Sequence, residues 1–209
     1  MYVEVMEEEW LLSEEQVRSL LKSIHEQPDA TRSVHPFMRT VAEHALFPFE
    51  ARALRVSDVA LLEGNGGELT VRRKGKEREM PLQSQFVEFL REWIRDVGLK
   101  EDDLLFPGMR GGAISESDYK QVWEQAQEAI LPRDELFFWR LGEPISILRD
   151  SCLVKWLRAG IPPVTVAELA GTTPRWLALR YPHCLRAGDA GIDGDHLAEG
   201  MALADSPKS

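Results

Sequence analysis

Residues 145–183 read ISILRDSCLVKWLRAGIPPVTVAELAGTTPRWLALRYPH and contain three helix signals in close succession. The first predicted helix covers 146–158 and is followed by glycine, and the second covers 163–169 and is opened by a proline pair. Thr173 and Pro174 fit the N-cap and first position of a third helix. The stretch therefore predicts a group of short helices joined by tight turns.

The sequence upstream of this stretch predicts more helices and one small sheet. Apolar residues recur at helical spacing or follow capping residues over 14–27, 33–46, 50–54, 86–97 and 115–130. A strand is expected over 56–62, and strands at 68–73 and 77–82 flank a Lys-Gly-Lys turn. We predict a mainly α fold with a small, three-stranded antiparallel β-sheet, an α+β class.

Length and composition indicate one globular domain. The chain has 209 residues, of which 44% are hydrophobic and 29% are charged. No apolar run reaches the ~18 residues of a membrane helix, and the acidic start lacks the basic region of a secretory signal. Cys152 and Cys184 give no disulfide framework. We expect a soluble, cytoplasmic protein without a membrane partner.

The chain divides into three parts by composition. Residues 1–10 form an acidic N-terminal extension, and residues 11–187 carry the predicted helices and strands. Residues 188–209 are rich in Gly, Ala, Asp and Ser, so we expect a flexible C-terminal tail.

Charge is distributed unevenly along the chain. The net charge of −10 argues against a general nucleic-acid binder, because phosphate contacts need a basic surface. Residues 71–78, VRRKGKER, nevertheless contain five basic residues and one acid. A local basic patch on the predicted hairpin is therefore expected.

Common cofactor and metal motifs are absent from the sequence. It contains no Gly-rich phosphate loop, no HExxH, no CxxC pair and no GxSxG. The five histidines are scattered without ligand spacing. No metal and no cofactor are expected.

The stretch at 145–183 resembles the last helices of the tyrosine recombinases, the phage-integrase family, whose motifs read HxLRH, AG, LLGH and RYxH. Arg149 falls on the arginine of the first motif, Gly160 on the glycine of the second, and Tyr181 on the nucleophilic tyrosine. Gly171 lies 22 residues after Arg149 and ten before Tyr181, and both spacings match the family without a gap.

Upstream segments resemble the same family in the same order. They are LLSEEQVRSLLKSI (11–24, the entry helix), EARALRVSDV (50–59), VRRKGKEREMPL (71–82, the hairpin) and LLFPGMRGGAIS (104–115, the LFP loop). The hairpin places Lys74 on the catalytic lysine of the family. The resemblance covers about 11–183 and implies a tyrosine-recombinase catalytic-domain-like fold over 11–187.

The resemblance implies a specific phosphoryl-transfer chemistry. The tyrosine, Tyr181 here, attacks a DNA phosphodiester and forms a 3′-phosphotyrosyl link. Arginines, among them Arg149, hold the nonbridging oxygens, and the lysine position, Lys74, protonates the leaving oxygen. The family uses no metal or cofactor for this reaction.

Three functional positions depart from the family pattern. Phe47 occupies the position of the first catalytic arginine, Ser146 replaces the first histidine of HxLRH, and Thr172 replaces the histidine of LGH. Asp150 follows Arg149 where a second histidine is common. A phenyl ring offers no donor to a phosphate, so we interpret the active site as degenerate.

Each family position also has a simpler structural interpretation. Tyr181 fits a core aromatic residue, and Lys74 fits a solvated hairpin tip. Arg149 fits either a solvated helix residue or a partner of Glu143. Ser146 fits an N-cap, Thr172 a loop residue and Phe47 a core residue. Replacement of the missing groups by His44, Arg52 or Arg140 is a further alternative.

We predict a DNA-binding protein linked to recombination or integration, typical of a mobile element, with strand cleavage weak or lost. An active recombinase acting through Tyr181 and a protein-interaction module that no longer binds DNA are the alternatives. The predicted DNA contacts are Arg72, Arg73, Lys74, Lys76, Arg78, Arg175 and Arg180. Binding should be weak and salt-sensitive, since the resemblance does not include the family's helical clamp domain. The expected partners besides DNA are further copies of the chain or a full-length recombinase.

Overall fold

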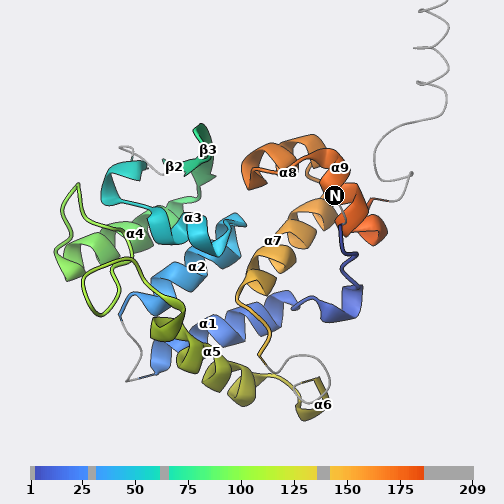
Figure 1. Cartoon of the computed structure of the whole chain (residues 1–209), viewed down its shortest axis with the longest axis horizontal. Coiled ribbons are helices and arrows are strands. Elements are labelled where there is room, and N and C mark those ends of the chain that lie inside the picture. The colour runs from blue at the N-terminus through green and yellow to red at the C-terminus, as the bar shows by residue number, and fades with distance from the viewer. Residues whose placement is uncertain (1–2, 28–31, 62–65, 136–141, 186–209) are drawn as a thin grey trace, which may run out of the picture.

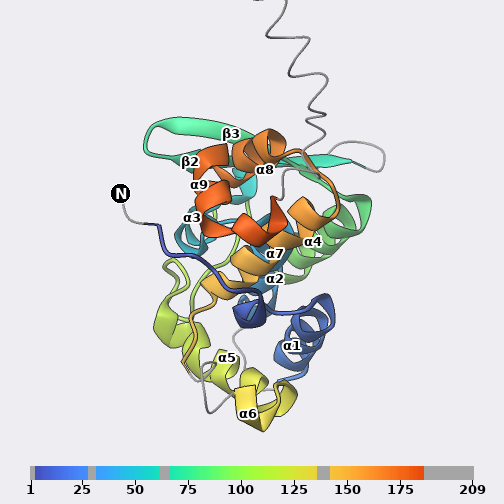
Figure 2. The ribbon, with the colours of Figure 1, turned by 90° about the vertical axis from the view of Figure 1, so that its right-hand side faces the viewer.

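The computed structural model describes residues 3–27, 32–61, 66–135 and 142–185. Figure 1 shows a helical body with α1 and α5 at one end and the strands with α8 at the other. Figure 2 shows the sheet lying over the central helices α2 and α7. The prediction of a mainly α protein with a small antiparallel sheet is confirmed.

The described residues form nine α-helices and three short 3-10 helices. The α-helices are α1 (Glu14–Glu26), α2 (Val34–His44), α3 (Pro48–Ala53), α4 (Ser84–Val97), α5 (Glu116–Ile130), α6 (Arg133–Glu135), α7 (Ser146–Arg158), α8 (Pro163–Ala170) and α9 (Pro174–Arg180). The 3-10 helices are η1 (Glu8–Trp10), η2 (Val56–Asp58) and η4 (Pro182–Cys184).

The sheet consists of β1 (Val59–Leu61), β2 (Gly67–Arg73) and β3 (Lys76–Leu82) in the order β1-β2-β3, with antiparallel pairing throughout. Lys74 and Gly75 form the tight turn of the hairpin with φ values of 50° and 74°. Positive φ at both turn residues matches the right-handed twist of the strands. The turn therefore fixes Lys74 at the tip of the hairpin.

Local capping signals fix several helix starts. Ser13 and Gln16 form a reciprocal capping box at α1, with hydrogen bonds of 2.9 and 3.1 Å. Asp118 accepts a hydrogen bond from the Ser115 backbone amide at α5 (2.7 Å), and Thr173 accepts one from the Trp176 amide at α9 (3.1 Å). The predicted N-cap at Thr173 is confirmed.

Three local predictions need correction. Ser146 is the first residue of α7 rather than its cap, since Ile145 occupies the cap position without a side-chain hydrogen bond. The strand predicted over 56–62 begins as the 3-10 turn η2, because Asp58 accepts a hydrogen bond from the Arg55 amide (2.8 Å) and tightens the chain there. The helix predicted over 50–54 begins earlier, at Pro48, since proline suits the first helical position. The tail predicted over 188–209 lies outside the described residues.

The core is built around two helices, α2 and α7, which pack against each other. Strands β2 and β3 close one side of it with Leu69, Val71, Met80 and Leu82, all buried. Along β2 the alternate residues Gly67, Leu69 and Val71 are buried, as expected for a strand with one face on the core. Among the described residues, no helix is long and apolar enough to cross a membrane.

The buried His44 at the end of α2 should make the stability of the protein depend on pH. The side chain is 4% exposed, its ring lies 4.2 Å from that of Phe86, and burial lowers its pKa from 6.5 to about 4. The unfolded chain takes up a proton in this window and the folded protein does not, so the free energy of unfolding falls as the pH falls from 6.5 towards 4. We expect His44 to account for a loss of about 2–3 kcal/mol.

Urea denaturation of wild type and His44→Gln at about pH 7 and about pH 4.5 measures this loss. The variant should lose less stability between the two conditions than wild type. His35, whose pKa burial also lowers to about 4, keeps part of the pH dependence in both proteins. An identical loss in both proteins would contradict the assignment to His44.

Candidate active site

Arg149 of α7 is the central cation of the candidate site, and it is enclosed. Its side chain is 2% exposed, and its guanidinium donates to the carbonyls of Ala45 and Ala170 (3.0 Å for Ala170). The face of the guanidinium lies 3.7 Å from the centroid of the Phe47 ring. Burial lowers the pKa of Arg149 to about 10, which leaves the group charged at neutral pH.

Tyr181, which follows α9, is fully buried at 0% exposure. Its hydroxyl donates a hydrogen bond to the carboxylate of Asp150, which also forms an ion pair with Arg180 at 3.2 Å. The Trp176 ring packs edge-on against the phenol with 5.9 Å between centroids. Burial, followed by the charge of Asp150, raises the pKa of Tyr181. This environment favours the neutral phenol over the nucleophilic phenolate.

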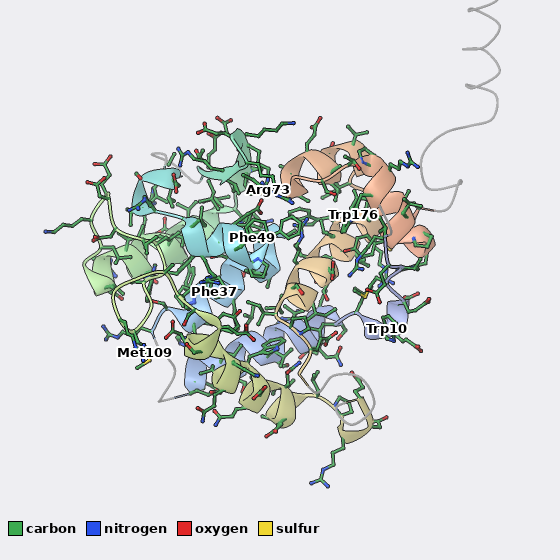
Figure 3. The ribbon with its side chains drawn as sticks, in the orientation of Figure 1. Trp10, Phe37, Phe49, Arg73, Met109 and Trp176 are labelled. Carbon is green, nitrogen blue, oxygen red and sulfur yellow. The ribbon has the colours of Figure 1, made fainter. Side chains whose placement is uncertain are left out.

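Phe47 connects the enclosed arginine to the surface. It precedes α3, and its ring stacks on the Phe49 ring with 5.2 Å between centroids and 20° between planes. Arg73 of β2 lies 4.4 Å from the Phe47 centroid and 5.5 Å from the Phe49 centroid. Arg149 and Arg73 therefore share one aromatic neighbour, in a cation–π arrangement. Figure 3 shows Phe49 and Arg73 close together between α3 and α8.

A buried ion pair joins the hairpin to α3. Arg78 of β3 donates to both carboxylate oxygens of Glu50 at 2.9 and 2.7 Å and to the Leu169 carbonyl at 2.8 Å. Gly171 has a φ of +62°, and a Cβ atom there would lie 2.7 Å from the Arg78 guanidinium. A glycine is therefore required where α8 ends against the hairpin.

The five basic residues of the hairpin fall into three groups. Arg72 pairs with Asp58 and Glu77, and Arg78 pairs with Glu50. Lys74 and Lys76 are exposed and have no ion-pair partner within the described part of the chain. Arg73 donates to the Gly171 carbonyl at 3.2 Å, which brings the hairpin next to the loop that opens α9.

Arg175 and Arg180, the two predicted DNA contacts on α9, also differ. Arg175 is exposed and carries no ion pair among the residues the structure describes. Arg180 is directed inward, where it pairs with Asp150 and donates to the Glu4 carbonyl at 3.0 Å. The acidic N-terminal segment therefore contacts the end of α9.

The structure places the three retained family residues at different depths. Besides the larger effect of burial, the charge of Asp150 acts to raise the pKa of both Arg149 and Tyr181, so the two residues lie near the same carboxylate. Lys74, in contrast, is exposed at the hairpin tip. Arg149 and Tyr181 are enclosed by packed side chains, so they do not share one open face with Lys74. A cavity of about 640 Å³ lies elsewhere, between α1, α2 and α7.

The three positions that depart from the family pattern, Phe47, Ser146 and Thr172, carry uncharged side chains. Ser146 and Thr172 are half-buried, and the Arg149 hydrogen bonds go to backbone carbonyls rather than to Glu143. His44 is buried against Phe86, and Arg52 acts electrostatically on Tyr119. Arg140 lies outside the described residues. No group of three or more His, Cys, Asp or Glu side chains that could hold a metal occurs in the described ranges.

Asp150, Glu50 and Phe49 are site residues that the sequence motifs did not identify as functional. Asp150 stands next to Arg149 in sequence, but its bond to Tyr181 spans 31 residues. Glu50 begins a recognised family segment without revealing its partner. For Phe49, the available signal was a second phenylalanine two residues after Phe47.

The bond between Tyr181 and Asp150 predicts a measurable coupling. Asp150→Ala leaves the phenol hydroxyl and Arg180 without their carboxylate, so we expect the free energy of unfolding to fall by about 2–3 kcal/mol. In a cycle with Tyr181→Phe, the double variant should be about 1 kcal/mol more stable than the sum of the single losses predicts. Urea denaturation of the four proteins measures the coupling, and a coupling of zero would mean that the two side chains do not interact.

Comparison with known proteins identifies the family of this chain. The family model described as the phage integrase family matches residues 11–183. Tyrosine recombinase XerC of Xanthomonas axonopodis pv. citri (strain 306) is 39% identical over 74 residues, which cover 32% of this chain and 24% of that protein. The chain thus matches about a quarter of the length of this curated relative.

Solved structures share the fold. The XerH site-specific recombinase bound to difH substrate, in a pre-cleavage complex, aligns with a TM-score of 0.68 and 18% identity over 99% of this chain and 57% of that chain. The catalytic domain of bacteriophage HP1 integrase aligns with a TM-score of 0.55 and 17% identity over 95% of this chain and 98% of that domain. Since the family model matches most of the sequence and the fold is that of the catalytic domain, this chain belongs to the phage integrase family of tyrosine recombinases.

Proposed function

We propose that this protein binds DNA in a recombination or integration process and that its strand-cleavage activity is weak or lost. The observation that carries the proposal is the enclosure of Arg149 by the Phe47 ring and two backbone carbonyls. Family membership supports the link to recombination. The XerH structures, which contain the difH substrate, support DNA as the partner.

Cleavage by this fold needs charge neutralisation at the phosphodiester. Two nonbridging oxygens must be held by preorganised donors while the phenolate attacks. Phe47 presents a ring at the position of one arginine, and Arg149 donates into the protein. Loss of one such donor costs roughly 10²–10³ in rate. The residues present therefore favour a slow or absent chemical step.

The nucleophile is held in a state that opposes attack. Tyr181 donates its hydroxyl to Asp150, and the negative charge of Asp150 disfavours a phenolate. Reaction would need Tyr181 to leave the carboxylate and reach the surface. Ser146 and Thr172, in the histidine positions, carry hydroxyls that do not titrate near neutral pH. Proton transfer is consequently weakened together with charge stabilisation.

Exposed cations supply the proposed DNA contact. Lys74, Lys76 and Arg175 are the predicted contacts that are exposed and form no ion pair with another described residue. Three phosphate contacts give weak, sequence-independent binding, because they read the DNA backbone and no base edge.

The salt dependence of duplex binding tests this contact. We expect a plot of log K against log salt with a slope of about −3, since each phosphate contact contributes about −0.9. Lys74→Ala should reduce the magnitude of the slope by about 1. Arg72→Ala is the matched control on the same hairpin, where Asp58 and Glu77 already neutralise the guanidinium, so its slope should stay close to that of wild type. Equal effects of the two variants would reject the hairpin tip as the contact, and absence of any salt-dependent binding would favour a protein-interaction module.

A nicked suicide duplex, which traps covalent intermediates, tests the chemistry. We expect no covalent adduct with wild type on a denaturing gel, and the same result with Tyr181→Phe. An adduct formed by wild type and absent from Tyr181→Phe would identify an active tyrosine recombinase instead. Adding back an arginine in Phe47→Arg provides a second comparison, since a gain of adduct there would attribute the lost activity to this position.

A further inference from the structure

Phe47, Phe49 and Arg73 form a surface cluster that we name the aromatic platform. The two rings are nearly parallel, and the Arg73 guanidinium lies within cation–π distance of both. Phe49 is 52% exposed although it is large and apolar. The guanidinium carbon of Arg149 packs over the Phe47 ring, 3.7 Å from its centroid. The platform is therefore a rigid base with one open ring.

The position of the platform brings it close to the proposed DNA contact. Arg73 immediately precedes Lys74 at the hairpin tip, and its guanidinium also donates a hydrogen bond to the Gly171 carbonyl. Figure 3 shows Phe49 and Arg73 next to each other, with Trp176 across from them on α9. The exposed Phe49 ring thus lies beside Arg73, which has no ion-pair partner among the described residues and precedes the exposed Lys74.

The chemistry of the cluster indicates the class of its ligand. A stacked aromatic pair with an adjacent guanidinium offers flat apolar area to a planar ring, and the neighbouring lysines offer attraction to phosphate. A nucleotide carries both features in one unit, because its base is planar and its phosphate is anionic. Bases inside an intact duplex are stacked on their neighbours and cannot reach such a ring.

We propose that the aromatic platform stacks an unpaired base, so that this protein prefers DNA with a bulged, gapped or single-stranded nucleotide over a perfect duplex. The inference rests on the proposed DNA binding and specifies the form of DNA that is bound. Phe49 provides the open face, Phe47 and Arg73 keep it in place, and Lys74 holds the adjacent phosphate.

Two duplexes of the same sequence, one perfect and one with a single unpaired 2-aminopurine, test the proposal by fluorescence anisotropy and base fluorescence. Wild type should bind the duplex with the unpaired base about tenfold more tightly and quench its fluorescence. Phe49→Ala should remove both the preference and the quenching, and Phe49→Leu, which keeps apolar area without a ring, should do the same. Lys74→Ala should weaken both complexes by a similar factor.

Met109→Ala is the matched control, since Met109 is an exposed apolar side chain (75%) away from the platform, as Figure 3 shows. Its preference and quenching should equal those of wild type, and circular dichroism should show that every variant is folded. Equal binding of the two duplexes by wild type, or quenching that survives Phe49→Ala, would overturn the stacking proposal while leaving DNA binding in place. Absence of binding to either duplex at low salt would overturn the proposed function and the inference together.

Discussion

The Arg149 guanidinium of α7 joins two segments that are distant from each other in sequence, residues 45–47 and the end of α8. It donates to Ala45 at the end of α2 and to Ala170 at the end of α8, and it stacks on Phe47 before α3. A buried cation is unfavourable unless its donors are satisfied, so these contacts must persist in the folded protein. They fix the hairpin side of the molecule as well, because Arg73 rests on the same Phe47 ring.

Much of the fold follows from local signals in the sequence. The capping residues Ser13 and Thr173 begin helices where expected, and the Lys74-Gly75 turn closes the predicted hairpin. These features depend on a few neighbouring residues and on side-chain periodicity, which a single sequence displays directly. The family motifs also placed Arg149 and Tyr181 near each other. Their depth was not predictable, since burial depends on which distant segments pack over a helix.

The local charge of the basic run was misleading for the same reason. Residues 71–78 contain five basic side chains, yet Arg72 and Arg78 are neutralised by carboxylates from η2 and α3. The partners of Arg78 and Arg180 lie 28 and 30 residues away in sequence, so a count of charge along the chain cannot reveal them. Structure thus reduces a basic stretch to a hairpin tip with two exposed lysines.

Phenylalanine at position 47, where the family pattern has arginine, affects both the stability of the folded protein and the chemistry of the site. An arginine there would repel Arg149 in a buried space unless a phosphate lay between them, whereas a phenylalanine attracts the same guanidinium through its ring face. The folded protein without DNA is therefore stabilised by Phe47, and the position loses a donor for phosphate chemistry. The same ring supports Phe49, which remains exposed next to Arg73. Under the proposed function, this exposed ring and the exposed lysines of the hairpin would contact nucleic acid through stacking and charge, whereas Phe47 offers no donor for cleavage of a phosphodiester.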